Sequence, residues 1–145
     1  MIQVAVHNAH GTRRVEARRI RTIVRRLLTD EGRGRANVSL VFTGDALSRR
    51  MNRKFFAHDR ATDVMSFPLE IGGDIEGEIY VNLDKATRQA RTYKVSLANE
   101  TARLVIHGVL HLVGYDDVAA AAARRMKKRE EFYVGRLAGK DSSGR

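Results

Sequence analysis

The stretch LVIHGVLHLVGYDD, residues 104–117, places two histidines inside an apolar segment of helical length. Because an α-helix turns every 3.6 residues, His107 and His111 lie on one face, one turn apart, and two imidazoles at this spacing can bind one ion. The apolar residues all round predict a buried helix. Gly114 suits the left-handed residue that ends many helices, so the chain turns back and brings Asp117 towards the same face. The pattern predicts a metal site.

The predicted ligand set has an open position. Two imidazole nitrogens and one carboxylate oxygen are three protein ligands, as in catalytic zinc sites. We therefore predict a metal-binding helix over His107–Val113, with His107, His111 and Asp117 holding one Zn²⁺ per chain. Asp116 is expected to orient a ligand or a water.

Three alternatives remain open at this point. The histidines can be core residues that are hydrogen-bonded to backbone. Two histidines and a carboxylate are also the ligand set of non-haem iron oxygenases. A metalloprotease helix of the form H-E-x-x-H carries its general base directly after the first histidine. Here Gly108 occupies that position, so peptide hydrolysis by this route is not expected.

The charge of the chain indicates a polyanionic partner. The 145 residues include 27 Lys and Arg against 17 Asp and Glu, a formal net charge of +10. Such a field attracts nucleic acid. The absence of cysteine excludes disulfides and thiolate metal sites. No apolar run has the length of a signal sequence or a membrane span, so we expect a cytoplasmic protein without membrane contact.

The hydrophobic pattern predicts one α+β domain, residues 1–145, with a roughly four-stranded mixed sheet packed with helices. Strands are expected over 2–8, 37–44, 62–70 and 78–83. Helices are expected over 13–30, 45–55, 84–93, 97–113 and 118–137, and the expected caps are Thr12, Asp45, Asp84 and Ser96. Pro68 is expected at the end of its strand. Residues 71–77 read as a glycine-rich turn, and 139–145 as a flexible tail.

Three segments in order resemble the YbeY-type endoribonucleases of rRNA maturation. HGVLHLVGYDD (107–117) is similar to their H-G-x-L-H-L-x-G-Y-D-H signature, TDVMSFPLE (62–70) to T-[DN]-V-L-S-F-P, and GEIYVNLDKATRQA (77–90) to a strand followed by a helix. The resemblance implies a small α+β zinc protein that cleaves single-stranded RNA in 16S rRNA 3′-end maturation and ribosome quality control. Its expected partners are rRNA and the small ribosomal subunit, not DNA.

The chain departs from this family pattern at two positions. Asp117 stands where the family has a third histidine; aspartate is a competent ligand, but its charge makes the metal a weaker Lewis acid. Phe56 stands where many members have an arginine implicated in activity. We expect Arg53, Lys54 or Arg60 to contact the phosphate in its place.

Further residues are weaker candidates for RNA contact and catalysis. The resemblance places Ser66 near the site, and His58 is a candidate for proton transfer. The arginine-coated helix from Arg13 to Arg26 is expected to contact RNA phosphates or simply to be solvated. Two other functions stay open: a ribosome-associated RNA-binding factor with a structural metal, and a metal-dependent hydrolase of another substrate such as peptide.

Overall fold

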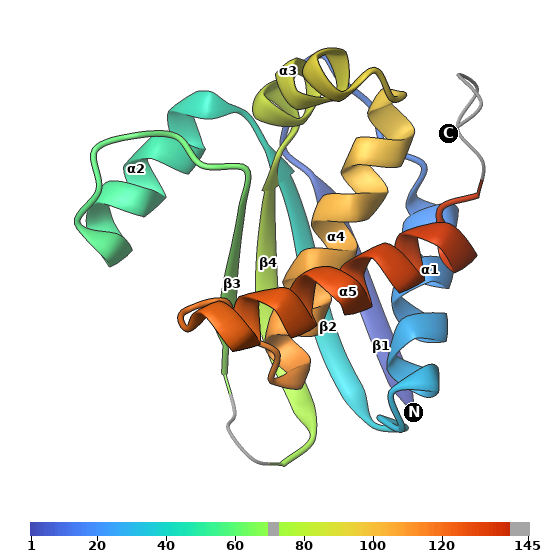
Figure 1. Ribbon diagram of the computed structural model, residues 1–145. Coiled ribbons are helices and arrows are strands. Elements are labelled where there is room, and N and C mark those ends of the chain that lie inside the picture. The colour runs from blue at the N-terminus through green and yellow to red at the C-terminus, as the bar shows by residue number, and fades with distance from the viewer. Residues whose placement is uncertain (70–72, 140–145) are drawn as a thin grey trace.

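Four strands form one mixed sheet in the order β1-β2-β4-β3 (Figure 1). The computed structural model describes residues 1–69 and 73–139. β1 (Ile2–Asn8), β2 (Ala36–Thr43) and β4 (Ile75–Asn82) run parallel to one another, and β3 (Val64–Pro68) is antiparallel to β4 at the edge. The predicted α+β class and mixed four-stranded sheet are confirmed.

In the described part of the chain, five helices accompany the sheet: α1 (Ala17–Asp30), α2 (Asp45–Phe56), α3 (Leu83–Tyr93), α4 (Leu97–Val113) and α5 (Ala120–Leu137). α4 packs against β3 and β4, and α1 packs beside it against β1. α5 crosses over α4 on the side away from the sheet (Figure 1). α4 is therefore covered by other elements along most of its length, which explains why its sequence is apolar almost all round.

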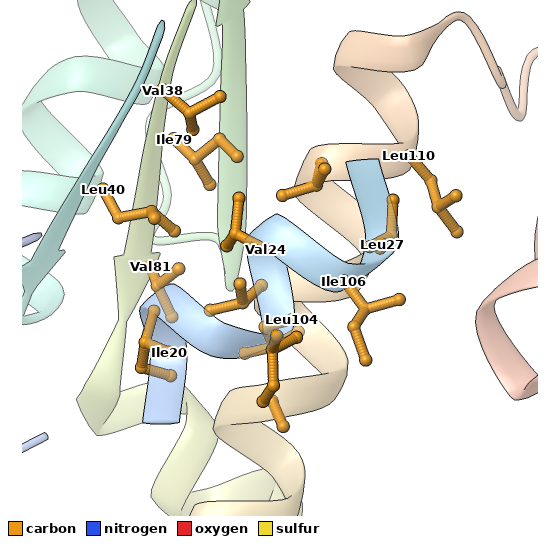
Figure 2. Packing of buried hydrophobic residues seen from close by; sticks show 14 of the residues in the cluster. Ile20, Val24, Leu27, Val38, Leu40, Ile79, Val81, Leu104, Ile106 and Leu110 are labelled. Atoms are coloured by element: carbon orange, nitrogen blue, oxygen red, sulfur yellow. The ribbon is translucent and has the colours of Figure 1, made fainter. Parts of the chain in front are cut away.

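The core lies between the sheet and the α1–α4 layer (Figure 2). Alternate residues of the central strands point into it, as the period of two in a strand requires. They meet the apolar stripes of the two helices, and the side chains labelled in Figure 2 are Ile20, Val24, Leu27, Val38, Leu40, Ile79, Val81, Leu104, Ile106 and Leu110. All ten are buried, so the histidine helix is fixed to the centre of the domain.

α1 begins four residues later than the periodicity predicts. The backbone N–H groups of Thr12 and Arg13 donate to His10 Nδ1, and Asn8 Nδ2 donates to the Arg13 carbonyl. These bonds hold residues 12–13 in a loop. The prediction that Thr12 caps the helix is wrong: the N-cap is Glu16, without a side-chain capping bond.

Two other predicted caps are also wrong. α3 is capped by Asn82, whose side chain accepts from the N–H groups of Asp84 and Lys85. Asp84 instead accepts from the backbone N–H of Asp45, which is the first residue of α2 and not its cap. A carboxylate can serve a helix terminus that is distant in sequence, and local patterns do not reveal this.

The two strands at this edge of the sheet, β3 and β4, start at other residues than predicted. β3 starts at Val64 because Thr62 exchanges hydrogen bonds with the Ser48 hydroxyl instead of pairing in the sheet. β4 starts at Ile75, inside the predicted glycine-rich turn, where Gly77 pairs with Pro68. Pro68 ends β3, as predicted. Residues 70–72 of that turn and 140–145 of the predicted tail lie outside the described residues.

α5 begins at Ala120, two residues after its predicted start. Ser96 caps α4, as predicted, by accepting from Asn99 N–H. None of the helices in the described ranges combines the length and apolar character that crossing a membrane requires.

Candidate active site

A cavity of about 420 Å³ lies where α2, β3 and α4 meet. Its wall includes all three predicted metal ligands: His107 and His111 from α4, and Asp117 from the loop that follows. The loop returns to the cavity because Gly114 adopts φ 122°, and its N–H bonds to the carbonyls of Leu110 and His111. The predicted helix end at Gly114 is therefore confirmed.

The ring of His107 is oriented by a carboxylate on another helix. Its Nδ1 lies 2.8 Å from Glu130 Oε1 on α5. Because an ionised carboxylate only accepts hydrogen bonds, Nδ1 carries a proton, and in the neutral ring Nε2 presents its lone pair. Nε2 lies 4.0 Å from Asp117 Oδ2 across the cavity. In metal sites, a histidine ligand is commonly oriented in this way, by a carboxylate that accepts from its other ring nitrogen.

Glu130 is buried and is held by cations as well as by His107. Its Oε2 accepts from Arg103 Nη1 at 2.9 Å and from Lys127 Nζ at 3.2 Å. Burial opposes ionisation, but the His107 hydrogen bond and the two cations outweigh it and lower the pKa of Glu130 to about 2. The same hydrogen bond, opposed by burial, raises the pKa of His107. Glu130 is therefore an anion that fixes the ring.

His111 is oriented by the turn that follows its own helix. Its Nδ1 donates to the Tyr115 carbonyl at 3.1 Å, and because a carbonyl only accepts, Nε2 is again the free nitrogen. The Tyr115 hydroxyl donates to Glu31 at the end of α1 at 2.9 Å, and Arg129 of α5 binds the same carboxylate. The turn is therefore tied to two helices distant in sequence.

These donors suit a divalent transition metal. Both imidazoles present Nε2 with Nδ1 engaged, and the nearby oxygen is a carboxylate, the N/O set that zinc accepts. The 4.0 Å between His107 Nε2 and Asp117 Oδ2 exceeds the roughly 3.3 Å that separates two ligands of tetrahedral zinc. Within residues 1–69 and 73–139, no group of three or more His, Asp or Glu side chains is arranged so that it could hold a metal ion. The chain presents suitable donors around a cavity, with Asp117 on a half-exposed loop.

Comparison with known proteins assigns the family. The family model of endoribonuclease YbeY matches residues 5–138. Endoribonuclease YbeY of Chlorobium luteolum is 38% identical over 136 residues, which are 94% of this chain and 98% of that protein. The protein of that name from Salinibacter ruber is 35% identical over 90% of this chain and 89% of its own length.

The chain belongs to the endoribonuclease YbeY family. Its fold is similar to the solution structure of TM1509 from Thermotoga maritima, with a TM-score of 0.64 and 26% sequence identity. That match covers 94% of this chain and 89% of the other. The resemblance seen in three sequence segments therefore extends over nearly the whole YbeY-type chain.

Gly108 explains why this YbeY-type helix lacks the metalloprotease glutamate. A Cβ atom at Gly108 would lie 2.7 Å from Ile79 Cγ2 and 3.2 Å from Ser66 Oγ. The helix therefore approaches the sheet too closely for any side chain at this position. Ser66 reinforces the approach, since its hydroxyl donates to the Gly108 carbonyl at 3.1 Å.

Only one of the four predicted phosphate-binding residues lines the cavity. Ser66 lies in the cavity wall, as the resemblance implied, but Arg53, Lys54 and Arg60 are not among the lining residues. Arg53 pairs with Asp59 at 3.5 Å. The ammonium group of Lys54 lies 5.3 Å from the centre of the Phe55 ring. None of these three residues therefore forms part of the cavity wall.

Several lining residues were weakly predicted or missed by sequence reasoning. His58 and Phe56 both line the cavity, together with Asn52 and Asp63, to which no role was assigned. Glu130 was missed as well. Glu130 and Glu131 are adjacent, and only Glu130 is in register with the buried residues of α5, one turn after Met126. Nothing in the sequence pairs it with a particular histidine.

Proposed function

We propose that this protein is a metal-dependent, single-strand-specific endoribonuclease that acts in 16S rRNA 3′-end maturation and ribosome quality control. Family membership supports cleavage of RNA. The observation that carries the metal dependence is the shared orientation of two imidazoles: each engages Nδ1 and presents Nε2 to the same cavity. The small ribosomal subunit in the cytoplasm is the proposed partner.

Each residue has a defined task in this proposal. His107, His111 and Asp117 would hold one zinc ion, which when bound supplies Lewis-acid activation of water and neutralises phosphate charge. Glu130 and the Tyr115 carbonyl keep the rings in the ligating tautomer. Arg53, Lys54 and Arg60 approach the RNA backbone outside the cavity, and Ser66 keeps β3 against α4.

The test of this function compares nucleic acids and peptides as substrates. We expect the zinc-loaded protein to cleave a single-stranded RNA, to leave the same sequence intact in a duplex, and to lose activity when a chelator removes the metal. Casein serves as the peptide substrate and should not be cleaved. Cleavage that persists after metal removal has been verified by mass spectrometry would contradict the proposed metal dependence.

The outer face of α1 is a second region suited to RNA. Arg18, Arg25 and Arg26 are exposed on it, and within the described ranges none of them forms an ion pair. The apolar stripe of the same helix is fully buried in the core, so it cannot insert into a membrane. Guanidinium groups bind phosphate bidentately. We therefore propose that this face contacts the rRNA backbone.

Removal of these charges is expected to change the salt dependence of binding. The triple variant Arg18→Gln, Arg25→Gln, Arg26→Gln should bind single-stranded RNA more weakly at low salt. The slope of log K against log salt should become shallower by about 2, since each phosphate contact to a single strand contributes about 0.7. Fluorescence anisotropy over a salt series measures this slope.

A scattered triple variant controls for net charge. Arg35→Gln, Arg91→Gln and Arg124→Gln remove the same charge from three separate parts of the molecule. This control should retain most of the wild-type slope. If the two triple variants change the slope equally, binding depends on net charge alone and the α1 face has no special role.

A further inference from the structure

The C-terminal end of α2 exposes two adjacent aromatic rings beside the cavity. Phe55 is 54% exposed and Phe56 is 44% exposed, although both are large apolar side chains. Phe56 also lines the cavity that contains His107 and His111. Exposed aromatic rings that continue into a polar cavity are unusual for a soluble surface and mark a binding site.

The two rings are held in place by the sheet edge beneath them. Their centroids lie 5.3 Å and 5.7 Å from that of Phe67 in β3, which in turn contacts Tyr80 of β4 at 5.7 Å. α2 stops directly after Phe56, where Ala57 adopts the left-handed conformation with φ 58°. The rings are therefore supported from below by neighbouring aromatic residues and remain open on their outer side (Figure 1 shows α2 beside β3).

The surroundings of the rings favour RNA over a protein partner. Arg53 and Lys54 precede them directly, and the Lys54 ammonium lies over the Phe55 ring at 5.3 Å. Cations interleaved with aromatic rings match a single strand, whose phosphates need positive charge and whose bases need a stacking surface. A purely apolar protein partner gives no reason for this positive charge.

We propose that Phe55 and Phe56 form a stacking platform on which a nucleobase of single-stranded RNA rests as the strand enters the cavity. This inference rests on the proposed function, because it takes single-stranded RNA as the substrate. Stacking needs a base that is not paired within a duplex, so the platform would contribute to selection of single strands. Arg53 and Lys54 contact the adjacent phosphates, outside the cavity wall.

Paired variants and abasic substrates test the platform. The variant Phe55→Leu, Phe56→Leu keeps apolar packing but removes both rings, and it should raise the Kd for a single-stranded oligonucleotide about tenfold, within the range of base–aromatic stacking. Moving one abasic residue along the oligonucleotide should locate a position where wild type and variant bind equally. In cleavage assays the loss should be larger in KM than in kcat, because the rings bind the strand and do not hold the metal.

Two further variants serve as controls for the loss of the rings. Phe56→Trp keeps an aromatic surface and should retain wild-type affinity, and Phe132→Leu removes a partly exposed ring on α5 and should have no effect. A 2-aminopurine at the abasic-sensitive position should be quenched on binding to wild type but not to the double leucine variant. An equal loss of affinity at every abasic position, or unchanged quenching, would overturn the platform.

Failure of the inference is distinguishable from failure of the proposed function. Oligonucleotide binding and 2-aminopurine quenching are measured without cleavage. If zinc-loaded wild type cleaves RNA but the leucine variant shows no base-dependent loss of affinity, only the platform is wrong. If wild type binds and quenches but never cleaves, the endoribonuclease proposal fails and the platform stands as a binding site.

Discussion

Replacing His107 with alanine is expected to remove the bound zinc and to lower RNA cleavage by more than about a hundredfold. Loss of an outer-shell partner already costs about 10–100-fold in affinity or activity, and loss of a ligand removes more. Metal content by mass spectrometry and initial cleavage rates on single-stranded RNA measure both effects. His111→Ala should behave in the same way, because both rings face the same cavity with Nε2 free.

Two other variants give graded controls for His107→Ala. Glu130→Gln should weaken zinc binding about 10–100-fold, since Glu130 orients the His107 ring without binding the ion. Glu131→Gln should leave zinc affinity almost unchanged: Glu131 pairs with Arg103 and Lys127 but is not bonded to His107. Full zinc occupancy in both single histidine variants would show that the metal site has been assigned to the wrong residues.

Substitution of Gly108 by glutamate should destabilise the fold by about 4 kcal/mol and should not create a protease. The change creates the H-E-x-x-H pattern, but a Cβ at this position would lie 2.7 Å from Ile79 Cγ2 in the buried core. Overpacking costs about 1–3 kcal/mol, and a carboxyl group buried without a partner adds a similar amount. Urea denaturation measures the free energy of unfolding, and casein digestion tests for protease activity.

Gly135 provides the matched control on another helix. It lies within α5, is exposed, and has no atom within 4 Å of its would-be Cβ. Gly135→Ala should therefore stabilise the protein by about 0.5–1 kcal/mol through helix propensity. A Gly108→Glu protein with wild-type stability would show that α4 does not approach the sheet as closely as described.

The histidine pair was predictable because its geometry is local. The period of the helix places His107 and His111 on one face, and a glycine directly after the helix turns the chain back. The position of the proposed phosphate-binding residues was less predictable. The sequence predicts Arg53 or Lys54 in place of the family arginine that is missing at Phe56, yet Asn52 and Phe56, which lie one turn apart on α2, line the cavity instead.

Sequence patterns alone determined the element types, the α+β class and the helix that carries both histidines, because hydrophobic periods and glycine conformation depend on neighbouring residues. Tertiary structure decided the rest. Glu130 meets His107 across 23 residues, and Glu31 meets Tyr115 across 84. These residues meet because α1 and α5 pack on α4. Packing also explains Gly108: the space for a side chain is removed by Ile79 of β4, which only the folded chain brings there.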